Sequence, residues 1–105
     1  MKKRYRYEFY LPLKHNNGKA VDDTKFERVK KMIGDEFDGV SVHYIKILGE
    51  WKDPTTGRVF RDDNLKYEVT VDNKEEKFFS ELKTTMKAMF GQKDIYMIMT
   101  VVESL

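Results

Sequence analysis

Residues 4–13 read RYRYEFYLPL, and this stretch alternates between two kinds of side chain. One set of alternate positions is aromatic or aliphatic: Tyr5, Tyr7, Phe9 and Leu11. The other set is charged or carries a hydroxyl: Arg4, Arg6, Glu8 and Tyr10. A period of two is typical of a half-buried β-strand. The stretch therefore predicts a sheet with one covered face and one open face.

A second strand with the same alternation lies further along the chain. Its inward positions are predicted to be Leu65, Tyr67, Val69 and Val71. Lys66, Glu68 and Thr70 are predicted to point outward. A last strand is expected from about Ile95 to Glu103.

Two segments carry apolar residues at helical spacing. The first stripe consists of Phe26, Val29, Ile33 and Phe37, and the second of Phe79, Leu82, Met86, Met89 and Phe90. Asp22, Asp23 or Thr24 can cap the first helix, and Thr24 with Glu27 has the spacing of a capping box. Asn73 with Glu76 repeats that spacing, and Gly91 is a natural residue to follow the end of the second helix.

The region after Val40 is less regular, because its apolar phase changes in mid-strand. This change predicts a β-bulge near residues 44–46 or a strand that leaves the main sheet. Asp53-Pro54 followed by Gly57 fits a tight turn. We therefore expect a long hairpin whose arm carries Trp51 and Phe60.

The predicted order is strand, helix, strand, strand, helix, strand. This order fits an α+β fold of the ferredoxin-like plait type, with a four-stranded antiparallel sheet and two helices on one face. The 105 residues are expected to form a single domain, residues 1–105, with the hairpin between the second and third strands as an extended arm.

Composition narrows the class of protein. The 20 basic and 18 acidic residues give a net charge of only +2, and cysteine is absent, so disulfides and thiolate chemistry are excluded. We expect no membrane partner, because no apolar run approaches the roughly 20 residues needed to cross a bilayer. The basic start lacks the apolar stretch of a signal peptide, so a cytoplasmic protein is expected.

The sequence offers no recognisable catalytic or metal-binding constellation. His15 lies in a turn and His43 on a strand, and neither has the spacing of a metal ligand. Acidic residues near the arm alternate with Lys52, Arg58 and Arg61, which favours ion pairing over cation binding. We therefore expect no metal and no cofactor. The predicted third strand exposes no aromatic residue, so nucleic-acid binding is disfavoured.

The last strand is apolar on both faces. Its outward positions are predicted to be Tyr96, Ile98, Thr100 and Val102. Strands of this kind are expected where both faces are covered, and a second copy of the chain can provide the cover, either sheet to sheet or edge to edge. Tyr10, Tyr96 and Ile98 are therefore predicted as an interface of a homo-oligomer.

The arm carries the one local grouping that resembles a binding site. It comprises Trp51, Phe60, Arg58 and Arg61. Tryptophan and arginine are enriched at binding hot spots, and arginine offers planar donors to a carboxylate or phosphate. Trp51 either folds back on the domain as a lid or anchors a partner or ligand.

Several short segments carry a resemblance to a known family. They are Leu11-Pro12-Leu13 with Asn17-Gly18, Phe37-Asp38-Gly39-Val40-Ser41, Gly49-Glu50-Trp51 with Thr56-Gly57-Arg58-Val59, and Phe90-Gly91-Gln92. In these pieces the chain resembles a family of small uncharacterised prokaryotic α+β domains of unknown function. The resemblance implies no activity and no catalytic residue. It gives weight to the arm and to Gln92.

These observations favour a non-enzymatic, homo-oligomeric module that binds a partner or a small ligand. One alternative is a small dimeric enzyme of the α+β-barrel type that acts on a small molecule without metal. In that enzyme His43, Tyr44 or Arg61 would move protons or orient the substrate. A second alternative is nucleic-acid binding through the basic amino terminus and Tyr10.

Overall fold

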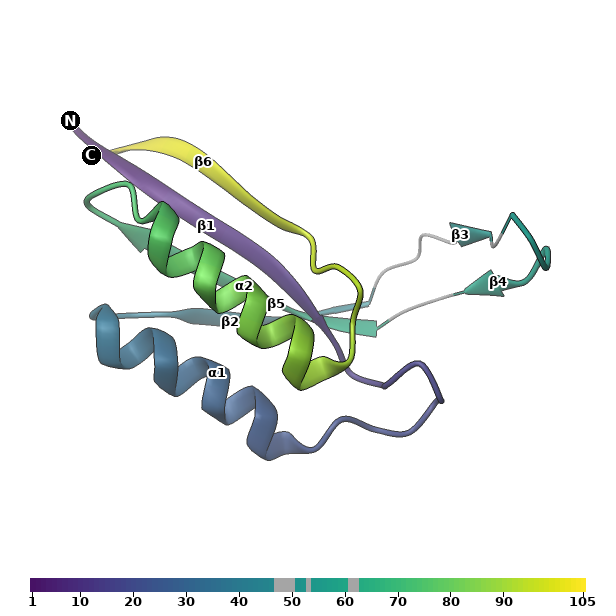
Figure 1. Ribbon diagram of the computed structural model, residues 1–105. Helices are drawn as coiled ribbons and strands as arrows, with labels where there is room; N and C mark the ends of the chain where they lie inside the picture. The colour runs from purple at the N-terminus through teal and green to yellow at the C-terminus, as the bar shows by residue number, and fades with distance from the viewer. Residues whose placement is uncertain (47–50, 53, 61–62) are drawn as a thin grey trace.

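The computed structural model describes residues 1–46, 51–52, 54–60 and 63–105, with the backbone alone for Lys46, Trp51 and Phe60. The chain forms an α+β fold of the ferredoxin-like type (Figure 1). The main sheet contains β1 (Lys2–Pro12), β2 (Ser41–Lys46), β5 (Asp63–Val71) and β6 (Met97–Ser104) in the order β2-β5-β1-β6. Its neighbouring strands are all antiparallel.

The helices α1 (Asp23–Glu36) and α2 (Glu76–Phe90) cover one face of this sheet (Figure 1). The core between the layers is rich in aromatic rings. Tyr7 stacks on Phe79 with ring centroids 3.8 Å apart, and Phe9 stacks on Tyr67 at 5.1 Å. The inward faces predicted for the strands that the structure shows as β1 and β5 are confirmed. Their residues Phe9, Leu11, Tyr67 and Val69 are all buried.

The two helix starts differ from the predicted capping boxes. The carboxylate of Asp22 caps α1, accepting hydrogen bonds from the backbone N–H of Thr24 at 2.9 Å and from its hydroxyl at 2.8 Å. Thr24 therefore lies inside the helix. Helix α2 begins after Glu75, which makes no side-chain cap; the Glu75 N–H instead donates to the hydroxyl of Tyr7 at 3.0 Å.

Helix α2 ends as predicted, because Gly91 takes the left-handed conformation with φ of 62°. A glycine reaches this conformation without the steric cost that a Cβ imposes. The chain then crosses to β6, which begins at Met97, two residues later than predicted.

The hairpin arm is a separate element. Strands β3 (Trp51–Lys52) and β4 (Val59–Phe60) pair antiparallel, with Trp51 opposite Phe60, and form a two-stranded sheet of their own. Figure 1 shows this hairpin standing away from the main sheet. The pairing of β2 with β5 is continuous from Ser41 to Lys46, so the predicted bulge is absent from these residues and the change of phase reflects a strand that leaves the sheet.

Candidate functional site

The face of the sheet that the helices leave uncovered, which we call the open face, carries a cluster of charges. Its members are Arg6, Glu8, His43, Lys66 and Glu68. The alternation of three neighbouring strands places them there. Each is opposite in orientation to the core residues beside it in sequence, such as Phe9 on β1 and Tyr67 on β5.

Two like charges face each other at the centre of this cluster. Glu8 on β1 lies directly opposite Glu68 on β5, an arrangement that destabilises a sheet when no cation intervenes. Here the guanidinium of Arg6 lies 2.9 Å from Glu8 and 3.5 Å from Glu68, measured from Nε to the nearest carboxylate oxygen. Lys66 adds its Nζ at 3.9 Å from Glu8. Arg6 lies diagonally across the strand pair from Glu68, and Lys66 lies diagonally across from Glu8. Their positive charges therefore offset the repulsion between the two glutamates.

Glu8 is unusually buried for a carboxylate on an uncovered face. Only 8% of its surface is exposed, although this face of the sheet has no helix over it. The Nε of Arg6 is also buried and makes no well-aligned hydrogen bond, so its contact with Glu8 is an ion pair without good hydrogen-bond geometry. Salt screens a partly buried ion pair such as this one less than it screens an exposed pair.

A hollow of about 440 Å³ lies at the end of the open face where the arm departs, and we call it the arm-base pocket. It is lined by Tyr10, Pro12, Asn64, Gln92, Asp94, Ile95 and Tyr96. Tyr10 and Tyr96 form an aromatic pair with ring centroids 5.9 Å apart. Asn64 is 8% exposed, because it lies between Pro12 and Ile45 on the neighbouring strands.

Besides the two tyrosine hydroxyls, the described side chains that line the arm-base pocket provide two amides and one carboxylate. The Gln92 amide nitrogen donates to the Phe90 carbonyl at 3.3 Å and to the Asn16 side chain at 3.4 Å, which fixes its orientation. Lys83 lies 3.1 Å from Asp94; its hydrogen bond, together with the N–H of Ile95, lowers the pKa of that carboxyl. No lysine or arginine is among the described residues that line the pocket.

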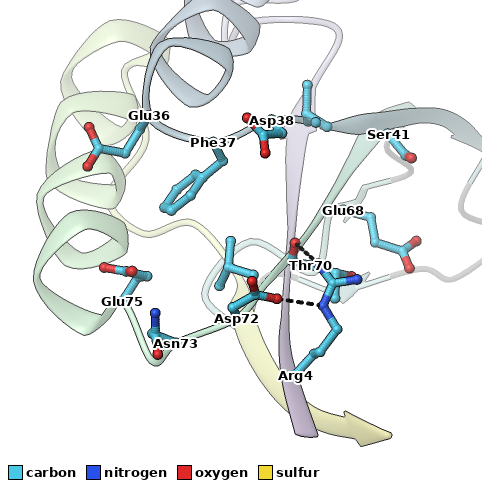
Figure 2. Close-up of a pocket in the computed structure, with 13 residues that line it drawn as sticks. Arg4, Glu36, Phe37, Asp38, Ser41, Glu68, Thr70, Asp72, Asn73 and Glu75 are labelled. Atoms are coloured by element: carbon cyan, nitrogen blue, oxygen red, sulfur yellow. Dashed lines mark hydrogen bonds and ion pairs between the residues drawn. The ribbon is translucent and has the colours of Figure 1, made fainter. Parts of the chain in front are cut away.

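A second hollow, of about 630 Å³, lies at the opposite end of the sheet and is shown in Figure 2; we call it the terminal groove. It exists because β2 starts at Ser41, opposite Glu68, while β5 continues to Val71 without a partner on that side. Glu36 at the end of α1 and Glu75 before the start of α2 lie on its helical side.

The terminal groove is acidic. Its described carboxylates are Glu36, Asp38, Glu68, Asp72 and Glu75, and Arg4 is the one basic side chain among the described residues that line it. Arg4 is already engaged, donating to Asp72 at 3.1 Å and to the Thr70 carbonyl at 3.5 Å. Lys2, by hydrogen bond and charge, and then Arg4 lower the pKa of Asp72.

The structure brings together two of the residues predicted as an interface. Tyr10 and Tyr96 both lie in the arm-base pocket. Ile98 lies on the same open face, opposite Glu8, and is half-buried. The oligomer predicted from these three residues stays a prediction.

The predicted arm site is only partly visible. Arg61 lies outside the described residues, and the side chains of Trp51 and Phe60 are not described, so their grouping stays a prediction. Arg58 is exposed on the hairpin, where its backbone N–H donates to the hydroxyl of Thr56 at 3.2 Å.

The residues proposed for an α+β-barrel enzyme are divided between the two faces of the sheet. His43 lies on the open face, 3.7 Å from Glu68, while Tyr44 is paired with Leu65 and shares the helix-covered face. Tyr44 is 61% exposed there, and β2 is an edge strand of the sheet. The two side chains therefore do not converge on one site.

Two features of the site were not singled out from the sequence. The alternation places Glu8 on the outward face but does not predict its burial, because that burial depends on contacts with the long side chains of Arg6 and Lys66. The pattern predicts a strand that resumes after Asn64, yet Asn64 is a buried residue of β5. The pairing with Pro12 that covers Asn64 has no signal in the local sequence.

The described part of the chain contains no group of three or more histidine, aspartate or glutamate side chains placed to hold a metal ion. In the same part of the chain, no helix has the length and apolar character required to cross a membrane. No protein-family model matches this chain, and no curated protein matches it in sequence.

Three solved structures are similar to the chain in fold. A phage SAM lyase in complex with S-methyl-5'-thioadenosine superimposes with a TM-score of 0.70 over 96% of this chain and 90% of its own, at 7% identity. GlnK from Bacillus subtilis in complex with ATP gives 0.64 over 97% and 84%, at 13% identity.

A Bacillus cereus protein related to NIF3 gives a TM-score of 0.61 and 11% identity. It covers 98% of this chain, but this chain spans only 26% of that larger protein. At these identities the three likenesses show the fold alone, since one fold hosts many unrelated functions.

Proposed function

We propose that this chain is a homo-oligomeric binding module whose ligand is a small adenine nucleoside held in the arm-base pocket. The observation that carries the proposal is the lining of that pocket. A pair of tyrosine rings, two side-chain amides and one carboxylate surround about 440 Å³, a volume in the range of small-molecule sites.

The chemistry of the lining suits a planar, uncharged heterocycle. An aromatic ring binds the face of a base, and stacking of this kind contributes roughly 1–3 kcal/mol per base. The amide of Asn64 offers both a donor and an acceptor, and Gln92, whose amide nitrogen is already engaged, offers its oxygen as an acceptor; the edge of a purine requires both kinds of group. The similarity in fold to two proteins crystallised with S-methyl-5'-thioadenosine and with ATP supports the choice of adenine.

The charges in the lining of the arm-base pocket favour an uncharged nucleoside over a nucleotide. The described lining carries no basic side chain, and its one carboxylate, Asp94, is already paired with Lys83, so the lining offers a triphosphate no cation. We therefore expect adenosine and S-methyl-5'-thioadenosine to bind more tightly than ATP. The acidic terminal groove is a poorer site for any of the three, because its carboxylates surround the single, already paired Arg4.

The homo-oligomeric part of the proposal has separate support. Ile98 and Val102 remain partly exposed on the open face, and β6 has no partner on its outer side among the described residues. Nucleic-acid binding has less support, because Glu8 and Glu68 occupy the centre of the face on which bases would stack.

Isothermal titration of the whole chain with adenosine, S-methyl-5'-thioadenosine and ATP tests the ligand. Tyr96→Ala should weaken nucleoside binding by roughly tenfold or more. Tyr44→Ala is the matched control, since Tyr44 is 61% exposed and Tyr96 63%, but on opposite faces of the sheet. Absence of nucleoside binding, or equal losses in the two variants, would overturn the proposal.

A further inference from the structure

No strand among the described residues pairs with the outer edge of β6. Strand β6 pairs with β1 on one side only, and it ends the order β2-β5-β1-β6. Natural proteins usually protect such an edge with lysine, proline, a bulge or a short length. The six residues from Met97 to Val102 contain no charge, no proline and no glycine, and β6 is eight residues long.

The side chains along this edge are apolar on both faces and incompletely covered. On the helix-covered face Met97 and Met99 are half-buried, and Val101 is 49% exposed. On the open face Ile98 and Val102 are half-buried. A second strand laid along β6 would cover both sets and would satisfy the free backbone groups of the edge.

We propose that the strand that pairs there is β6 of a second copy of this chain, antiparallel, about a two-fold axis through Thr100. Directly opposite residues of antiparallel strands lie on the same face. With both helical layers on one side of the joined sheet, this axis places Ile98 opposite Val102 of the second copy. On the other face Met99 lies opposite Val101 of the second copy, and Thr100 meets its own counterpart.

The strand is self-complementary in this register. From Ile98 to Val102 apolar residues meet apolar residues on each face, and Thr–Thr pairs are favourable across strands. The one charge of β6, Glu103, lies near the end of the strand, so it meets Met97 of the second copy only at the two ends of the junction. An axis moved by one residue to Val101 would instead set Ile98 against Ser104 and Met99 against Glu103 of the second copy, which brings the charge nearer the centre of the junction and leaves fewer apolar pairs.

The same register connects the junction to the arm-base pocket. Continued beyond β6, it places Ser104 of the second copy beside Tyr96, at the rim of that pocket. The proposed pairing therefore adds a residue of the second copy to the rim of the arm-base pocket. The inference rests on the homo-oligomeric part of the proposed function and gives that oligomer a particular junction.

Cross-linking tests the junction directly, because the chain contains no cysteine. Opposite Cβ atoms of antiparallel strands are about 4.5–5.5 Å apart, close to what a disulfide requires. Under a mild oxidant, Thr100→Cys should form a covalent dimer in high yield. Thr85→Cys, an exposed threonine of α2, is the matched control and should remain a monomer on a denaturing gel.

A mixing experiment fixes the register. Ile98→Cys mixed with Val102→Cys should give the heterodimer, while each variant alone should cross-link far less. Light scattering on the unmodified chain distinguishes the two proposals. A monomer at all concentrations would overturn both the oligomer and the junction, whereas an oligomer in which Thr100→Cys behaves as Thr85→Cys does would overturn the junction alone.

Discussion

The two faces of the sheet are built from alternate residues of the same strands, yet they differ in every physical respect. Phe9 is completely buried against Tyr67 beneath the helices, while its neighbour Tyr10 lies on the open face beside Tyr96. The covered face holds stacked rings, and the open face holds coupled charges between two hollows. We therefore expect stability to depend mainly on the covered face, and the proposed ligand binding to depend on the open face.

The largest expected effect follows from truncating neighbours on the two faces. Phe9→Ala should lower the free energy of unfolding by about 3–5 kcal/mol, because it removes a buried ring and leaves a cavity. Tyr10→Ala should lower it by less than about 1 kcal/mol while weakening nucleoside binding. Urea unfolding of the two variants measures this difference in stability. Comparable losses in the two variants would contradict the expectation that the covered face contributes most of the stability.

A smaller effect is expected within the charge cluster. Glu8→Ala should destabilise the fold by about 1–3 kcal/mol. The variant removes the carboxylate that neutralises the partly buried positive charges of Arg6 and Lys66. Glu81→Ala, on an exposed part of α2, is the control and should stay within about 0.5 kcal/mol of the wild type. The double variant Arg6→Ala/Glu8→Ala should recover part of the loss, which a double-mutant cycle would detect.

A hydrogen bond on the covered face provides the next test. The hydroxyl of Tyr67 donates to the carbonyl of Phe26 at 3.2 Å, and Tyr67→Phe should cost about 1 kcal/mol. Burial, with a smaller contribution from Glu27, raises the pKa of Tyr67 to about 12. Because the pKa is raised, the associated stability is present below the ordinary value of 10 and is lost as the pH rises through 12.

Ultraviolet titration checks that value. The tyrosinate absorbance present in the wild type and missing from Tyr67→Phe should have its midpoint near 12. A midpoint near 10 in this difference would show that the hydroxyl is accessible and not held in the core.

The smallest expected effect concerns the charged rim of the open face. The pKa of Asp72 is lowered by Lys2 and Arg4, so its contribution to stability is present above the ordinary carboxyl value of 3.8 and is lost as the pH falls below it. The difference in unfolding midpoint between the wild type and Asp72→Asn should therefore be small at neutral pH and vanish in acid. A difference that grows on acidification would contradict this sign.

The architecture could be predicted from the sequence because it depends on local periodicity. Alternation at Tyr7 and Phe9 assigns the faces of β1, and the helical stripes identify the helix sides that pack on the sheet. Among the helix caps, Asp22 was one of the predicted candidates and Gly91 was predicted correctly, whereas the two capping boxes were wrong for a physical reason. Asp22 competes with Thr24 for the same role, and the hydrogen-bond partner at the start of α2 comes from β1, far away in sequence.

The candidate site could be predicted only in part. Tyr10 and Tyr96 were expected to be exposed on one face, but an alternating pattern does not reveal that their rings meet at a hollow. Asn64 and Gln92 join that hollow through strand register and the end of α2, which are tertiary properties. Spacing along the chain carries no information about either.

The hydrogen bond between Tyr7 and Glu75 has a consequence for how the molecule opens. The ring of Tyr7 belongs to the core, while its hydroxyl holds the backbone amide at the start of α2. The first turn of that helix therefore depends on β1 being in place and does not fray on its own. In hydrogen exchange the Glu75 amide should open only with the sheet, which makes strand and helix one cooperative folding unit.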